Sequence, residues 1–415
     1  MPASTDITPK TDPNRRYWNE EAQTMPPDAL RALQEDRLRE AVGRAYEGAG
    51  FFRRRFDEAG IRPDDVKTLD DLPRIPRFQK EALRENEAAH PPVGDYRVSG
   101  LRGAIRLAMS TGTTGRPTFS LWTRHDLALE CELGARMQWR LGTRPGMIVA
   151  NAHPGYLNGG QAFISALYES MGCLSISLGP PESVESAEAA LRAIEHIPID
   201  HWGLFPAALH RFREAAARIG YQGTLPEPEE VGPTYQYDRI SAGQECVGFL
   251  GSACSPGRGS HLAEDYAIVE ALDPATGDRV PDGHRGYFVI TSLGRDNPMI
   301  RYDMEDVIRL EPKPCDCGET SQRAFWEGRG KDIVEVQDRW VLPIDVWKEV
   351  PADAEFVLVR PASRADVLTV RIEGTPAGDL ADRITAAIGV PVVVEAVADG
   401  TLPRSAYKAQ RVVDE

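Results

Sequence analysis

An alternation of apolar and amphipathic segments between residues 119 and 219 constrains the fold more than any other feature. Four short apolar runs are predicted strands: 119–122, 147–150, 174–178 and 199–205. Four segments with the apolar spacing of helices follow them: 124–141, 160–171, 186–196 and 207–219. Strands that alternate with helices predict parallel β-α-β units, whose ligands bind at the carboxyl ends of the strands.

Composition and charge exclude several classes of function. The chain has 415 residues, 41% hydrophobic and 27% charged, which is ordinary for a soluble globular protein of two domains. The net charge of −15 argues against nucleic acid or an anionic membrane as partner, so any phosphate site must be local. No apolar run reaches membrane-spanning length. The polar segment Met1–Arg16 lacks the centre of a signal peptide, and we expect a flexible leader on a cytoplasmic protein.

The region before residue 100 reads as helical. Apolar residues recur at helical spacing from Ala29 to Phe56, and a short charged helix is predicted to start at Lys80. We expect this region to serve packing.

A stretch rich in glycine and hydroxyl groups, Ser110–Thr118, lies between two apolar runs. Its glycines can adopt positive φ, so consecutive N–H groups can turn around an anion, and its hydroxyls and guanidinium can bind phosphate oxygens. The candidate phosphate-binding residues are Ser110, Thr111, Gly112, Thr113, Thr114, Gly115 and Arg116. The spacing is not that of a P-loop, and these residues alone also fit a plain polar loop.

Three cysteines and a histidine in the second half of the chain have the residue types of a metal site. They are Cys254, His261, Cys315 and Cys317. Three thiolates and one imidazole complete a tetrahedral zinc shell, and Gly318 permits a tight turn beside the Cys-x-Cys pair. The alternative is a set of incidental thiols. The other cysteines are predicted to be packed thiols: Cys131, Cys173 and Cys246.

The loop and the metal-type residues together resemble a known family. Ser110–Thr118 resembles the phosphate loop of the adenylate-forming (ANL) superfamily, with Arg116 where most members carry lysine. The short chain and the order of its cysteines and histidine look most like the phenylacetate–CoA ligase-like branch. The resemblance implies that the loop binds ATP phosphates and that the three cysteines and the histidine hold structural zinc. A closed shell of four protein ligands leaves no position for water, so we assign the zinc no catalytic role.

The chain departs from this family between residues 219 and 245. Relatives continue there with a strand, an adenine-contacting turn of the Gly-Ala-Glu-Pro type and a helix. Here residues 224–237 lead directly to Ser241–Glu245, so we expect a strand–helix unit to be deleted. Of the family's next motif only Glu245 is kept, and the resemblance implies that it ligates magnesium. Either adenine is held in another way, or the nucleotide is bound weakly or not at all.

Two later segments resemble the family's ribose and hinge motifs. Arg301–Asp306 resembles a motif whose closing aspartate, Asp306 here, accepts both ribose hydroxyls. Gly328–Asp332 resembles the hinge between the domains, with Arg329 at the position of an arginine near ribose and phosphate, and Lys331 at the pivot. The resemblance therefore predicts a large domain over residues 1–328 and a small one over residues 329–415.

The C-terminal segments predict a β-β-α-β lid: 355–359, 367–372, 379–388 and 392–397. The final segment resembles the family's Pro-Arg-Ser-x-Gly-Lys motif, with Tyr407 in place of glycine, and the catalytic lysine falls on Lys408. We therefore predict an α/β protein. A large N-terminal domain with mostly parallel β-sheets flanked by helices precedes a small α+β C-terminal lid domain. Within the large domain, residues 267–272 and 286–292 are predicted to be antiparallel strands joined by turn-rich segments.

The resemblance implies an acid-binding pocket at the carboxyl ends of the first strands, lined by an aromatic and Gly-Gly stretch. Its candidate residues are Trp122, Tyr156, Gly159, Gly160, Phe163 and Phe205. Their aromatic character favours an aromatic acid, although the glycine pair also fits a plain strand-to-helix turn.

The resemblance implies ATP-dependent, AMP-forming ligation of a carboxylic acid to a thiol such as coenzyme A. ATP, Mg²⁺ and structural Zn²⁺ are the expected cofactors, coenzyme A or another acceptor is the second substrate, and a homodimer is one open assembly state. Glu245 and Lys408 are the expected catalytic residues. Three alternatives remain: an enzyme for another oxyacid or an amine acceptor, a degenerate binding protein, and a zinc hydrolase. The closed zinc shell disfavours the last.

Overall fold

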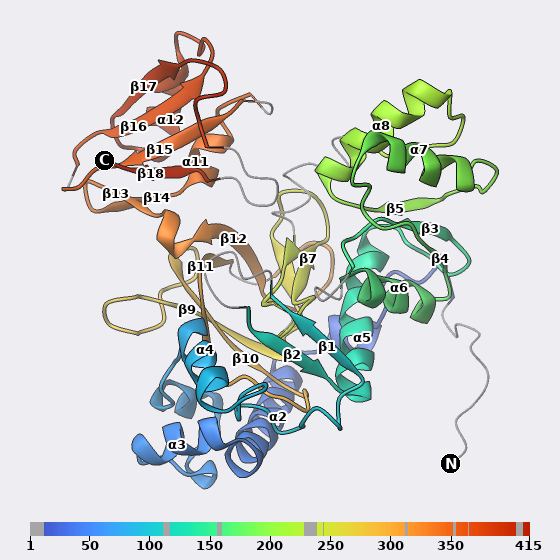
Figure 1. The fold of residues 1–415 in the computed structure, drawn as a ribbon. Coiled ribbons are helices and arrows are strands. Elements are labelled where there is room, and N and C mark those ends of the chain that lie inside the picture. The colour runs from blue at the N-terminus through green and yellow to red at the C-terminus, as the bar shows by residue number, and fades with distance from the viewer. Residues whose placement is uncertain are drawn as a thin grey trace. The chain divides into compact units, whose positions relative to one another are not determined.

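The computed structural model describes residues 12–110, 117–155, 160–227, 239–243, 245–311, 314–351, 354–363, 365–403 and 410–415. The chain forms two compact units (Figure 1). The first comprises residues 1–304 and 309–326, and the second residues 305–308 and 327–415. The second unit's long segment thus begins close to the predicted boundary at residue 329. Of the described helices, none is both long and apolar enough to cross a membrane.

The N-terminal part of the first unit is helical, as predicted. Its elements are α1 (Glu20–Gln23), α2 (Pro27–Gly48), α3 (Gly50–Glu58), the 3-10 helices η1 (Pro63–Asp65) and η2 (Leu69–Arg74), and α4 (Lys80–Ala89). The helix predicted over residues 29–56 is two helices, because Ala49 adopts an extended conformation. Three phenylalanines of α3 are buried, and two of them pack edge-on against Phe78.

A short hairpin carries the glycine-rich stretch. Strand β1 (Arg106–Met109) pairs antiparallel with β2 (Phe119–Trp122), and the two strands form a sheet of their own. The predicted strand at 119–122 is therefore confirmed. The candidate phosphate loop is the connection of this hairpin.

The predicted β-α-β region is confirmed as a three-stranded parallel sheet. Its strands are β3 (Ile148–Asn151), β4 (Leu174–Ser177) and β5 (His201–Gly203), in the order β4-β3-β5. The helices of this region are α5 (Arg124–Arg140), α6 (Gly160–Ser170), α7 (Val184–Ala193) and α8 (Pro206–Ile219). Thr123 and Asp126 cap the start of α5 reciprocally, and Gly220, at φ 66°, ends α8.

The largest sheet corrects the expectation of mostly parallel sheets. Its strands are β6 (Arg239–Ile240), β7 (Gly251–Ala253), β8 (Ser260–Leu262), β9 (Ala267–Leu272), β10 (Arg285–Ser292), β11 (Tyr302–Glu311) and β12 (Arg323–Arg329). The order is β6-β7-β8-β12-β11-β10-β9, and the pairs β6–β7, β7–β8, β8–β12 and β9–β10 are antiparallel. Turn-rich connections without a crossover helix join consecutive strands, and such connections favour antiparallel pairing.

The second unit has the predicted α+β composition. Its elements are η4 (Gly330–Asp332), β13 (Val334–Val336), β14 (Arg339–Val341), α11 (Pro343–Trp347), β15 (Phe356–Arg360), β16 (Leu368–Glu373), α12 (Leu380–Ile388), β17 (Val392–Val397) and β18 (Val412–Asp414). Strands β15 to β18 form a sheet in the order β17-β16-β15-β18, so the β-β-α-β prediction is confirmed. Phe356, Leu358, Val370 and Ile384 are among the buried residues of its core.

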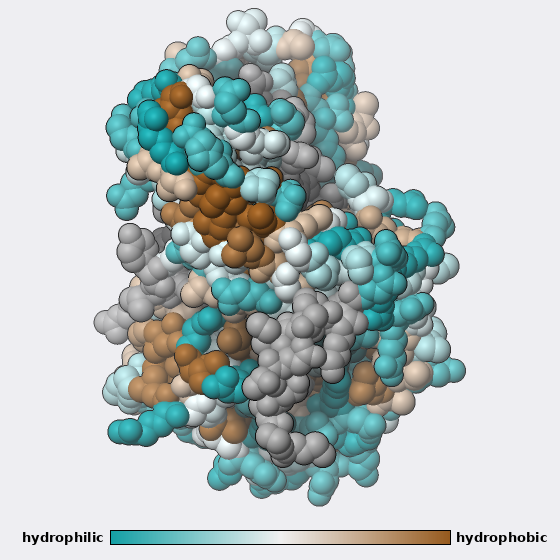
Figure 2. All heavy atoms as spheres, turned by 90° about the vertical axis from the view of Figure 1, so that its right-hand side faces the viewer, coloured by the Kyte–Doolittle hydropathy of each residue, from teal (hydrophilic) through white to brown (hydrophobic). Residues whose placement is uncertain are grey.

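The surface on the side of α7 and α8 is shown in Figure 2. Apolar side chains gather there in separate patches among hydrophilic ones. Across the described part of the chain, Leu174 on the edge strand β4 and Phe205 are the most and fourth most exposed large apolar side chains, at 57% and 47%.

Candidate active site and metal centre

The base of the candidate phosphate loop is tied by its two end residues. The Ser110 N–H donates to the Thr118 carbonyl at 2.9 Å, and the Thr118 N–H donates to the Ser110 hydroxyl at 3.0 Å. The remaining loop residues that we predicted lie outside the described part of the chain: Thr111, Gly112, Thr113, Thr114, Gly115 and Arg116. The loop connects two strands of a hairpin, which agrees with the exclusion of a P-loop, since that motif joins a strand to a helix.

Glu245, the predicted magnesium ligand, lies in a largely buried polar cluster. Its side chain is 7% exposed, and one carboxylate oxygen lies 2.9 Å from the Lys80 ammonium and accepts a hydrogen bond from the Tyr302 hydroxyl at 3.3 Å. Gly243, at φ 75°, leaves room for the carboxylate, because a Cβ there would lie 2.8 Å from its other oxygen. The cluster therefore already holds one cation against the predicted metal ligand.

Because it contacts Glu245, Lys80 is a candidate site residue, and sequence reasoning missed it. We expected the helix that it begins to serve packing alone. The sequence did contain a signal that Lys80 has a partner, because a cation at the first position of a helix is unfavourable beside the positive end of the helix dipole. Such a residue is expected to have an acidic partner, and here the partner is Glu245.

The structure brings two of the predicted ribose-site residues together within the second unit. Arg329 lies 2.9 Å from the carboxylate of Asp306, whose side chain is 6% exposed. The predicted pivot, Lys331, lies in η4. The Arg360 guanidinium donates to the Lys331 carbonyl and also to the Ile333 carbonyl, the latter at 3.1 Å. Lys408 lies outside the described residues, so its catalytic role stays a prediction.

The predicted acid-pocket residues occupy different environments. Trp122 and Phe163 are buried in one apolar cluster, with ring centroids 5.0 Å apart in an edge-to-face arrangement. Phe205 is half-exposed and packs edge-on against His153 at 5.2 Å. Gly160 is the first residue of α6. Tyr156 and Gly159 lie outside the described residues, and the acid-binding role of all six stays a prediction.

Two histidines near the parallel sheet were not predicted as site residues. His153 follows β3 and lies 3.0 Å from the Asn151 side chain, and His201 begins β5. Burial, together with the nearby Arg239 cation, lowers the pKa of both imidazoles to about 4. Both rings are therefore neutral at pH 7 and can donate or accept hydrogen bonds there.

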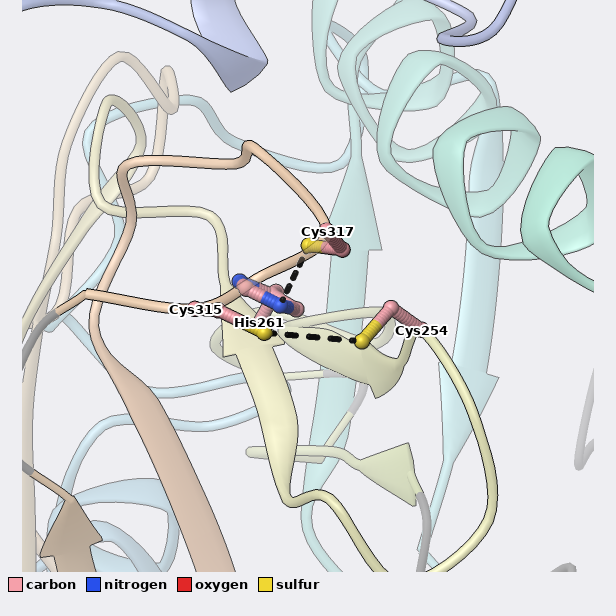
Figure 3. A group of neighbouring side chains, drawn as sticks. All are labelled: Cys254, His261, Cys315 and Cys317. Atoms are coloured by element: carbon pink, nitrogen blue, oxygen red, sulfur yellow. Dashed lines mark hydrogen bonds between the residues drawn. The ribbon is translucent and has the colours of Figure 1, made fainter.

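The predicted metal residues converge, as Figure 3 shows. The ligand atoms of Cys254, His261, Cys315 and Cys317 all lie within 4.8 Å of one another. The Cys254 and Cys315 sulfurs are 3.8 Å apart, and the Cys317 sulfur is 3.3 Å from Nε2 of His261. Two sulfurs each about 2.3 Å from one zinc at a tetrahedral angle lie about 3.8 Å apart. The donor set therefore fits a tetrahedral metal site.

The surroundings of the cluster also suit a metal. Burial lowers the pKa of His261 to about 4, so its imidazole is in the neutral form that ligates metals. Its other ring nitrogen lies 3.2 Å from the Ser321 hydroxyl, an orienting contact typical of ligating histidines. Gly318 has φ 87°, which explains the glycine after the Cys-x-Cys pair. The three other cysteines are buried, as predicted.

The expected flexible leader is corrected only for residues 12–16, because residues 1–11 lie outside the described part of the chain. Arg16 and Tyr17 donate to the Cys317 carbonyl at 2.5 and 2.7 Å, and the Arg15 carbonyl accepts from the Trp139 indole at 3.0 Å. These bonds fix the described part of the segment against the metal cluster and α5. Sequence reasoning missed this because hydrophilic composition does not show which distant groups a segment meets.

Comparison with solved structures assigns the fold to acyl-adenylate-forming CoA ligases. Structures of 2-hydroxyisobutyryl-CoA ligase match 99% of this chain. The complex with R3-HIB-AMP has a TM-score of 0.81 at 24% identity and is covered over 94% of its length. The open conformation with 2-HIB-AMP and CoA has a TM-score of 0.74 at 25% identity and is covered over 97%.

Comparison with curated protein sequences identifies the family within this fold. The chain is 31% identical to phenylacetate-coenzyme A ligase of Thermus thermophilus over 382 residues, 86% of this chain and 84% of that protein. It is 30% identical to the enzyme of the same name from Aromatoleum evansii over 434 residues, 93% and 94% of the two chains. No family model matches the chain. The chain belongs to the phenylacetate–CoA ligase family.

The comparison also bears on the predicted deletion. The alignment with the Pseudomonas putida relative runs over 438 positions although it takes in only 95% of a chain of 415 residues. That relative therefore has residues that this chain lacks. Residues 228–238 lie outside the described part, and no helix or strand lies among residues 220–227, which follow α8.

Proposed function

We propose that this protein is an AMP-forming ligase that adenylates a carboxylic acid with ATP and transfers the acyl group to coenzyme A. The observation that carries the proposal is the 31% identity to a phenylacetate–CoA ligase over 86% of the chain. Family membership supports the acid and coenzyme A as substrates. The proposal goes further in giving roles to particular residues and in assigning an aromatic acid.

In the first half-reaction, adenylation of the acid, the negative charge of the ATP phosphates must be neutralised. We assign the phosphates of ATP to the loop Ser110–Thr118, whose ends are already fixed by the hairpin. Mg²⁺ bound at Glu245 would neutralise phosphate charge. Lys80 holds that carboxylate in place at 2.9 Å. The acid's carboxylate attacks the α-phosphate, pyrophosphate leaves, and Lys408 stabilises the charge that develops.

The ribose site is assigned to Asp306 and Arg329. An ionised carboxylate can accept from both hydroxyls of a diol, and Arg329 at 2.9 Å keeps Asp306 oriented. Arg360 binds the carbonyls of Lys331 and Ile333 and so defines the backbone on either side of the proposed pivot. Rotation at this position between the two half-reactions is part of the proposal.

The acid is proposed to be aromatic. Trp122 and Phe163 pack together in an apolar cluster beside α6, and the names of the curated relatives give phenylacetate as their acid. A planar ring would extend the edge-to-face packing of these two side chains.

The Cys3His cluster is proposed to bind zinc in a structural role. Its sulfur–sulfur distance of 3.8 Å is that of a tetrahedral zinc–thiolate site, and four protein ligands complete the shell. Its role would be to join the loop after β7 to the loop after β11.

Pyrophosphate exchange tests the proposed function. Labelled pyrophosphate should enter ATP in the presence of an aryl acid from a panel that includes phenylacetate, and adding coenzyme A should give the thioester. Lys408→Ala should abolish the exchange, whereas Lys67→Met, at an exposed site, should leave it intact. If no acid supports exchange and Lys408→Ala changes no measured property, the protein is not an adenylating enzyme.

A further inference from the structure

The hairpin that carries the candidate phosphate loop has no strand neighbour among the described residues. β1 and β2 form a two-stranded sheet, separate from the other four sheets of the structure. An isolated two-stranded hairpin is at best marginally stable in water. Its position must therefore come from contacts outside the ladder, and these contacts would also set the position of the loop Ser110–Thr118.

The backbone of β2 bonds in two directions. On the side of β1, the Thr118 carbonyl accepts from the Ser110 N–H at 2.9 Å, and the Trp122 carbonyl accepts from the Ile105 N–H at 2.8 Å. In an antiparallel pair the residues between such positions direct their N–H and C=O groups to the other side. Phe119, the first residue of β2 after the loop, is one of these.

Side chains rather than a strand satisfy this outer edge. The Phe119 N–H donates to Glu87 at 3.0 Å. The Phe119 carbonyl accepts from the Tyr96 hydroxyl at 3.3 Å and from the Arg97 guanidinium. Two positions further on, the Leu121 carbonyl accepts from the Asn297 side chain at 3.1 Å.

A single oxygen of Glu87 is the centre of this network. It accepts from the Phe119 N–H at 3.0 Å, from the Tyr96 hydroxyl at 2.8 Å and from Arg97 at 3.0 Å. The side chains of Glu87 and Arg97 are 9% and 3% exposed, and Tyr96 is 1% exposed. Because Arg97 balances the charge of Glu87, the network adds no net negative charge beside a loop assigned to phosphate.

The helix that carries Glu87 also carries Lys80. The two residues are seven positions apart on α4, which is two turns, so they lie on the same helix face. Lys80 holds the carboxylate of Glu245, and Glu87 holds the exit of the loop. One face of α4 thus contacts both groups to which the phosphate end of the nucleotide site is assigned.

We infer that Glu87 is a positioning residue for adenylation: with Arg97 and Tyr96 it fixes the end of the phosphate loop through the backbone of Phe119. The inference rests on the proposed function for its catalytic consequence. Its structural part, the fixing of the hairpin, stands on the hydrogen bonds alone. It predicts that loss of Glu87 affects the step that uses ATP phosphates and spares the step that does not.

The test compares Glu87→Ala and the milder Glu87→Gln with Glu85→Gln, a matched control at an exposed position of the same helix. Three quantities are measured on the full-length protein. They are the KM for ATP in pyrophosphate exchange, thioester formation from supplied acyl-adenylate and coenzyme A, and amide hydrogen exchange of the peptide that contains Phe119.

We expect Glu87→Ala to raise the KM for ATP about tenfold or more, because small displacements of a binding group are costly. Thioester formation should stay within about twofold of wild type, and the Phe119 amide should exchange at least about tenfold faster. For Glu87→Gln, the KM for ATP and the exchange rate of the Phe119 amide should lie between those of wild type and Glu87→Ala, since the amide oxygen can still accept from the Phe119 N–H. Glu85→Gln should match wild type in all three.

Several results would overturn the inference. One is unchanged protection of Phe119 in Glu87→Ala; another is a parallel fall of both half-reactions. If Glu87→Ala does not fold, Glu87→Gln decides by the same criteria. A wild-type protein that exchanges no pyrophosphate with any acid refutes the proposed function instead. In that case protection of Phe119 alone decides whether Glu87 fixes the hairpin.

Discussion

Replacement of one metal ligand tests the Cys3His cluster most directly. A metal bound by both Cys254 and Cys315 links residues 61 positions apart. Closing a loop of that length removes unfolded-state entropy worth about 4 kcal/mol at 25 °C by the relation used for cross-links. Cys315→Ser should therefore lose the metal and a comparable part of the stability. For a unit of this size, that loss corresponds to a fall in melting temperature of about 5–10 °C.

Two measurements on the same samples check this prediction. Elemental analysis should find about one zinc per wild-type chain and almost none in Cys315→Ser. Calorimetry should show the lower melting temperature in Cys315→Ser and in wild type treated with a chelator, but not in Cys173→Ser, whose thiol lies outside the cluster. Wild-type protein without bound metal, or a melting temperature that chelation leaves unchanged, would refute the structural-metal assignment.

Two further predictions concern stability. Lowering the pH from 6.5 toward 4 should destabilise the protein by up to about 3 kcal/mol for each of His153 and His201. Their folded pKa of about 4 lies below the unfolded value, so the unfolded state binds protons first; urea unfolding across this pH range is the measurement. Lys80→Met should lower the free energy of unfolding by about 1–3 kcal/mol, because Glu245 keeps its buried charge, whereas Lys67→Met should change it little.

Much of the fold could be predicted because its elements are encoded locally. The alternating strands and helices between residues 119 and 219, and the β-β-α-β order of the C-terminal unit, follow from hydrophobic periodicity and caps. The antiparallel pairing of residues 267–272 with 286–292 was predicted from the turn-rich segment between them, and β9 and β10 confirm it. The pairing direction of the other strands of the large sheet did not follow. Periodicity identifies a strand but not its neighbour, and we extended the parallel rule beyond the region that has crossover helices.

The candidate site also contains residues that could be predicted from the sequence and residues that could not. The metal residues were predictable because few residue types ligate zinc and they come in recognisable spacings; the structure brings all four together. Asp306 and Arg329 were found through a motif, and they form an ion pair. Lys80, Glu87 and the segment at Arg16 were missed, since their importance depends on partners more than thirty residues away in sequence.

The described residues after α8 pack on the core beside the parallel sheet, in the region where we predict that the family's adenine turn is missing. Among the described strands, β5 is at one edge of its sheet. The Trp202 indole donates to the Thr224 carbonyl at 2.9 Å, and Tyr221 and Leu225 pack on the same core as Trp202. Residues of this segment therefore cover part of the core directly after α8. Because these contacts form without any nucleotide, the predicted loss of the adenine-contacting turn is tested by nucleotide-dependent assays rather than by stability measurements.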